Sequence, residues 1–81
     1  MKISNKFVFV LVRDIDCEPG EELAVFSCDD FSLSKLEIFF SDICELPESV
    51  KPSEFEIKSL FDEHFVNMGW GYFNLMKFKI L

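Results

Sequence analysis

Phe7-Val8-Phe9-Val10-Leu11-Val12 is the stretch that decides the fold of this chain of 81 residues. Every position in it is apolar, and such a run is typical of a strand covered on both faces. We therefore expect residues 6–12 to form the central strand of a small sheet. The run stops at Arg13-Asp14, short of the ~7–15 residues of a secretory signal core and the ~18 residues of a membrane span. We therefore expect neither a signal peptide nor a membrane helix.

Around this strand the sequence predicts a single α+β domain, residues 1–81, with the element order β-β-α-α-β. A second strand is expected over residues 23–28, joined to the first by a loop of about eight residues that contains the turn signal Pro19-Gly20. A last strand is expected over residues 72–81. We expect two helices to pack on one face of a three-stranded sheet, with strand 6–12 in its middle.

The two helices are predicted by apolar residues that recur at three- and four-residue steps. The first is expected to begin at Ser32 or Ser34, where Ser34 and Glu37 have capping-box spacing, and to end before Pro47. The second is expected to begin at Ser53, which has the same spacing to Glu56, and to run to Met68, with Gly69 as its cap. The apolar stripes are Leu33, Leu36, Phe39, Phe40 and Ile43 in the first helix, and Ile57, Leu60, Phe61, Phe65 and Met68 in the second.

The second face of the sheet presents a packing problem. Two helices cover only one face, yet strand 6–12 is apolar on both parities, with Phe7, Phe9 and Leu11 on one and valines on the other. Monomers rarely expose an apolar patch of more than a few hundred Å². We expect a partner or a second copy of the chain to cover this face, the alternative being that residues 14–22 or 69–71 fold over it.

Charge is distributed unevenly along the chain, which holds 15 acidic and 8 basic residues for a net charge of −7. All 15 acids lie within residues 14–63, which contain only three lysines, whereas both ends of the chain are basic. A field of this sign repels phosphate backbones and anionic membranes, so we expect no direct nucleic-acid or membrane binding. A basic protein surface is the natural complement, although net charge of this size also serves solubility alone.

The chain has three cysteines, Cys17, Cys28 and Cys44. An odd number at these spacings does not indicate a disulfide framework, which favours free thiols in a cytoplasmic protein. They form no close pair of the kind that zinc sites use, and the only histidine, His64, has no oriented partner suggested by spacing. We therefore expect no catalytic residues, no metal and no cofactor. Threonine and glutamine are absent and phenylalanine occurs 11 times, which indicates an AT-rich coding source such as a low-GC bacterium or a phage.

The remaining hypothesis is a non-catalytic, acidic, protein-binding module or inhibitor that docks on a basic partner, one that could itself bind nucleic acid. Phage-encoded inhibitors of host defence, of the anti-CRISPR or anti-restriction type, immunity proteins and antitoxins share this logic of charge and size. The alternative is a small structural or assembly protein that self-associates through its apolar sheet face. Trp70, between two glycines, is either a core residue or an exposed anchor. The candidate partner-binding residues are Asp14, Asp16, Glu18, Glu21, Glu22, Asp29, Asp30, Glu37, Asp42, Glu45 and Trp70.

Overall fold

The computed structural model describes residues 6–15 and 20–79 and shows an α+β fold with one antiparallel sheet. The sheet has four strands in the order β2-β1-β4-β3, rather than the three that the sequence predicted. Their bounds are β1 Phe7–Ile15, β2 Glu21–Ser27, β3 Phe65–Asn67 and β4 Gly71–Lys79. The strand built on residues 6–12 is central, as predicted, and shares the centre of the sheet with β4.

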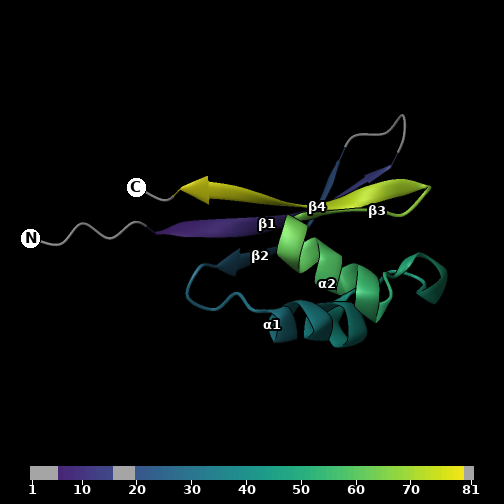
Figure 1. The fold of residues 1–81 in the computed structure, drawn as a ribbon, viewed down its shortest axis with the longest axis horizontal. Helices are drawn as coiled ribbons and strands as arrows, with labels where there is room; N and C mark the ends of the chain where they lie inside the picture. The colour runs from purple at the N-terminus through teal and green to yellow at the C-terminus, as the bar shows by residue number, and fades with distance from the viewer. Residues whose placement is uncertain (1–5, 16–19, 80–81) are drawn as a thin grey trace, which may run out of the picture.

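All the helical segments lie on one side of this sheet (Figure 1). They are α1 Leu33–Ile38, the π-helical turn η1 Phe39–Ile43, the 3-10 turn η2 Glu48–Val50 and α2 Glu54–Glu63. The prediction of two helices on one face is therefore confirmed at the level of layers, while the first helix is shorter than predicted. Ser53 and Glu56 form the predicted capping box, with both hydrogen bonds present. The first helix is capped by Ser32, whose hydroxyl accepts a hydrogen bond from the Lys35 amide.

The predicted helix 53–68 is wrong beyond Glu63. His64 adopts a left-handed conformation at φ 63° and ends α2, with its amide donating to the Leu60 carbonyl. The next residues form β3, in which Val66 pairs with Phe73 of β4. Gly69, at φ 91°, is therefore not the cap of a helix, as predicted, but lies in the turn of the β3–β4 hairpin. Strand pairing with β4 thus overrides the helical spacing of Phe65 and Met68.

The core lies between the sheet and the helical segments and is built largely from phenylalanine rings. Phe40 stacks edge-on against Phe73 with ring centres 5.2 Å apart, and Phe9 lies 4.6 Å from Phe31. Leu11, Leu36 and Leu60 are fully buried among these rings. The rings allow a chain of this length to fill a core with few residues, because each buries ~150–250 Å².

On the opposite face of the sheet, residues 6–15 and 20–79 place no helix (Figure 1). The register places Val10 opposite Val25 on one side and Met76 on the other, and places Val8 opposite Phe78. Phe65 lies on the same face, because its partner Asn74 also pairs with Val12. We call this surface the open face and define it by six residues: Val8, Val10, Val25, Phe65, Met76 and Phe78.

Candidate binding surface

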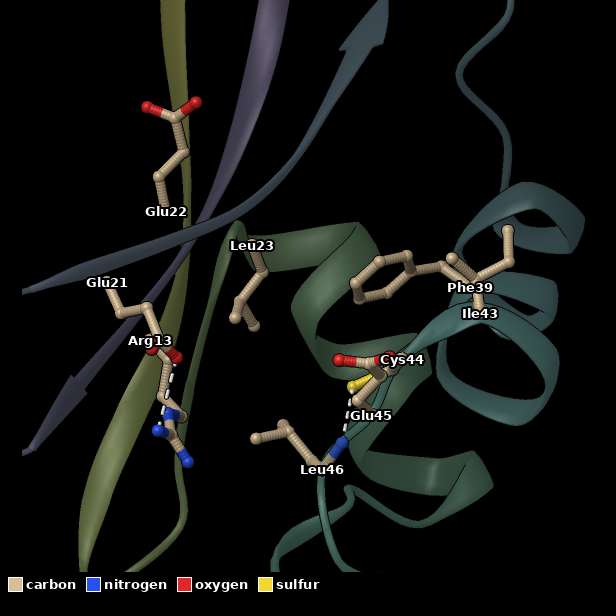
Figure 2. Close-up of a pocket in the computed structure, with 9 residues that line it drawn as sticks. All are labelled: Arg13, Glu21, Glu22, Leu23, Phe39, Ile43, Cys44, Glu45 and Leu46. Carbon is tan, nitrogen blue, oxygen red and sulfur yellow. Dashed lines mark hydrogen bonds and ion pairs between the residues drawn. The ribbon is translucent and has the colours of Figure 1, made fainter.

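A groove separates β2 from the end of η1 and contains three of the predicted acids (Figure 2). Its volume is about 450 Å³. Glu21 and Glu22 border it from the start of β2, and Glu45 borders it from the segment after η1. Figure 2 shows the Glu22 carboxylate directed away from Arg13 and Leu46, so Glu22 supplies the rim rather than the interior.

Arg13 is the one basic residue in this groove, and it is already engaged. Its guanidinium lies 3.1 Å from Glu21 and 5.9 Å from the centre of the Trp70 ring. Its Nε is buried and finds no hydrogen-bond acceptor within residues 6–15 and 20–79. Arg13 therefore neutralises Glu21, and Glu22 and Glu45 are the groove carboxylates that form no ion pair among the described residues.

A second groove, of about 440 Å³, separates α1 from the start of α2. Glu37 borders it from α1, and Glu54, Phe55 and Lys58 border it from α2. Phe55 is 79% exposed, although it is one of the largest apolar side chains in the chain. An exposed ring beside carboxylates is the composition expected of a contact anchor with a polar rim.

Glu37 and Glu45 do not lie on one helix, although the predicted first helix, which ended before Pro47, would have included both. The helix changes to a π turn at Phe39 and ends at Ile43, and Cys44 is already extended at ψ 133°. Glu45 therefore lies outside the helix and borders the β2 groove, whereas Glu37 borders the α2 groove. The two carboxylates flank the α1–η1 segment on opposite sides.

The other candidate residues are spread over the molecule. Asp29 and Asp30 lie in the turn after β2, at the far end of that strand from Glu21, and Asp30 pairs with Lys35 at 3.5 Å. Asp42 is exposed on η1. Asp14 lies on the side of the sheet opposite the helices, in register with Tyr72. Asp16 and Glu18 lie outside the described residues.

Of the two alternatives for Trp70, a core residue or an exposed anchor, the structure favours packing against the core. Its ring is partly buried and stacks edge-on against Phe73, with ring centres 5.6 Å apart. Gly71 beside it allows a close approach of two strands, because a Cβ there would overlap the Asp14 carbonyl oxygen. Trp70 therefore packs the end of the sheet and holds Arg13 in place.

The segment 28–64, which contains all the helical elements, carries ten carboxylates and three lysines, a net charge of −7. We call these ten carboxylates the acidic layer. Each of the three lysines lies within 3.5 Å of a carboxylate: Lys35 of Asp30, Lys51 of Glu48 and Lys58 of Asp62. No lysine or arginine among the described residues forms an ion pair with Glu37, Asp42 or Glu45. Among the described residues, the unneutralised negative charge is therefore concentrated in the segment that forms the helical side of the sheet.

Sequence reasoning missed the apolar members of this surface, Phe55 and Ile43. A signal for Phe55 is present, since it falls off the stripe Ile57, Leu60 and Phe61 that packs on the core. Ile43, which is 63% exposed, was assigned to the core because it continued the spacing of the first helix. The π turn changes that phase and turns Ile43 outward into the rim of the β2 groove.

Groups that could carry chemistry are not brought together in the part of the chain that the structure describes. No set of three or more His, Cys, Asp or Glu side chains there could hold a metal ion. His64 packs edge-on against Phe9, with ring centres 5.1 Å apart, at the end of α2. Cys28 and Cys44 are free thiols, and Cys17 lies outside the described residues.

No helix within residues 6–15 and 20–79 combines the length and the apolar character that crossing a membrane requires. Comparison with known proteins, by family model, against curated proteins and against solved structures, gives no match to this chain.

Proposed function

We propose that this chain is a non-catalytic binding protein that docks its acidic layer on a basic surface of a partner protein and blocks that surface. The observation that carries the proposal is the concentration of unpaired carboxylates on one side of the sheet, beside two grooves. Every lysine of the layer is held by a neighbouring acid, so the field outside this side stays negative. A complementary basic surface would be steered toward it.

Both grooves combine two carboxylates that form no ion pair among the described residues with one exposed apolar side chain. These sets are Glu22 and Glu45 with Ile43, and Glu37 and Glu54 with Phe55. Arginine and lysine have the matching structure, an aliphatic stem that packs on apolar surface and a charged head. Arginine also stacks on an aromatic ring, with a gain of ~0.5–2 kcal/mol. We therefore propose that arginine or lysine side chains of the partner occupy these grooves.

Charge and burial contribute differently to such a complex. An exposed ion pair contributes only ~0–1 kcal/mol, so the carboxylates chiefly set the association rate and its dependence on salt. Burying the exposed ring of Phe55 contributes ~1.5–3 kcal/mol and sets the lifetime of the complex. Substitution of Phe55 should therefore accelerate dissociation, while substitution of Glu37 or Glu45 should slow association.

The test is affinity capture from the native cell, followed by binding measurements on the purified partner. Glu45→Lys should weaken binding and flatten its dependence on salt. Asp14→Lys is the matched control, because it makes the same change of charge on the side of the sheet opposite the helices, away from both grooves. Equal binding by the triple variant Glu37→Lys/Asp42→Lys/Glu45→Lys would refute the proposal.

Phage inhibitors of host defence, immunity proteins and antitoxins remain the classes that this proposal favours, by analogy of charge and size. If the blocked surface binds nucleic acid, duplex DNA should displace the protein from its partner. The alternative, an assembly protein that works through its apolar sheet face, is supported by the open face. It predicts that function survives charge reversal in the acidic layer and is lost on substitution of Phe78.

A further inference from the structure

We propose that the open face is the interface of a homodimer, in which two copies pack sheet to sheet with their strands running in opposite directions. This inference goes beyond the proposed function, because it concerns the side of the sheet that the acidic layer does not use.

The apolar side chains of the open face form continuous rows across the strands. Val25, Val10 and Met76 form the central row, and Val8 and Phe78 form the next row toward the start of β1. Val25 is 55% exposed, Phe78 47%, Phe65 45% and Met76 41%. These are the exposures of side chains that stand upright on a pleated sheet and have no other described residue packed over them.

The area fits a weak but specific dimer. The four exposed side chains contribute on the order of 350 Å² of apolar surface, since a large side chain buries ~150–250 Å². With the half-buried valines and the rim, the contact reaches roughly 500–600 Å² per copy, near the lower limit of ~1,200 Å² in total for specific interfaces. A dissociation constant in the micromolar range is therefore expected.

Charge indicates why the partner is a second copy. The helical side of each copy repels the same side of another, but the register places only two charged strand residues, Asp14 and Glu22, on the side of the open face. In a sheet-to-sheet dimer the two acidic layers lie about 30 Å apart, three layer spacings of ~10 Å. That distance exceeds the Debye length of ~8 Å at physiological salt, so the layers barely repel each other.

The charged residues on the open side of the sheet set the direction of packing. The register places Asp14 and Glu22 on that side, both toward the end of β1, whereas Lys77 and Lys79 lie on the helical side. A two-fold axis parallel to the strands would bring the Asp14 and Glu22 carboxylates of the two copies together. A two-fold axis perpendicular to the strands places these carboxylates at opposite ends of the contact, so we expect the strands of the two copies to run in opposite directions.

The test is the mass of the wild-type protein by sedimentation and light scattering, from micromolar to near-millimolar concentrations. The mass should rise from 9.5 kDa toward twice that value. Phe78→Glu should raise the dissociation constant by about a hundredfold or more, because it buries an unpaired carboxylate in the contact. Phe55→Glu is the matched control, because it places the same side chain on the helical side and should leave the dimer intact.

Far-UV circular dichroism shows whether each variant is folded, and the wild-type measurement does not depend on any variant. A monomeric wild-type protein at near-millimolar concentration would overturn the proposal, as would a dimer that survives Met76→Glu/Phe78→Glu. Asp14→Asn/Glu22→Gln should change the dissociation constant little, because the antiparallel arrangement keeps these carboxylates of the two copies apart. A marked strengthening of the dimer by this double variant would overturn the antiparallel arrangement.

Discussion

Gly71→Ala tests the strand register on which both binding surfaces depend. A Cβ at position 71 would overlap the Asp14 carbonyl oxygen and would lie 3.0 Å from both the carbonyl carbon of Asp14 and the Cα of Ile15. All three are backbone atoms of β1, so no side chain can rotate away. The variant can fold only if β1 and β4 separate at the Ile15–Gly71 pair, which would also disturb the packing of Trp70 on Phe73.

We expect Gly71→Ala to cost about 2–4 kcal/mol of unfolding free energy, as overpacking against rigid neighbours does. For a chain of 81 residues the total is about 4–12 kcal/mol, so the loss is a large share of the stability. The melting temperature should fall by about 10 °C or more. Urea unfolding followed by far-UV circular dichroism gives the free energy directly.

Gly69→Ala is the control, because its Cβ would meet no atom within 4 Å and its cost arises only from the left-handed φ of 91°. That cost is ~1–2 kcal/mol. A Gly71→Ala variant that unfolds at the wild-type midpoint, or that is more stable than Gly69→Ala, would refute the register. A slip of one residue would exchange the two faces of β4, and the open face would then consist of different side chains.

Three further substitutions test the core, a cap and the exposed surface. Phe40→Ala should cost about 3–5 kcal/mol in urea unfolding, because the ring is only 2% exposed and its loss leaves a cavity; a loss below 1 kcal/mol would contradict its place in the core. Ser53→Ala should cost about 1 kcal/mol, since it removes the hydroxyl that accepts from the Glu56 amide; Ser49→Ala, in a turn with no such cap, is its control. Phe55→Ser should leave the unfolding free energy within about 0.5 kcal/mol of the wild-type value, because the ring is exposed; a large loss would show that Phe55 supports the fold rather than a contact.

The sequence predicted the layers of this fold better than the ends of its elements. The unbroken apolar run at residues 7–12 indicated a central strand, but because it is apolar on both parities it did not show which face the helices cover. The end of α2 could not be found in this way, because Phe65 and Met68 continue the helical spacing. The competing signal was the pair Phe65-Val66, an aromatic and a β-branched residue, followed by the turn at Gly69. Only pairing with β4, a contact across the chain, decides between the two structures.

The candidate site was predictable in charge but not in geometry. Counting residues shows that the centre of the chain is acidic, yet it does not show that Glu37 and Glu45 border different grooves. Their separation follows from the π turn at Phe39, and a π turn has no strong sequence signature. The exposure of Phe55 could have been inferred from the sequence, because this residue lies off the apolar stripe that packs on the core. The contacts of Arg13 with Glu21 and Trp70 could not be predicted without the fold, because the three residues come from different segments of the sequence.

The two proposed surfaces lie on opposite sides of one sheet, so the experiments on them can be read independently and then together. A change on the open face, such as Phe78→Glu, alters dimerisation but leaves the acidic layer of each copy in place. If both proposals hold, the dimer presents two acidic layers about 30 Å apart, and a partner with two basic sites at that spacing binds it with a gain from effective concentration. Phe78→Glu then weakens binding to that partner but not to a single-site fragment of it, whereas Glu45→Lys weakens both. Loss of single-site binding on Phe78→Glu would instead mean that the open face contacts the partner directly. That result would favour the assembly protein that works through its apolar sheet face over the inhibitor that docks through its acidic layer.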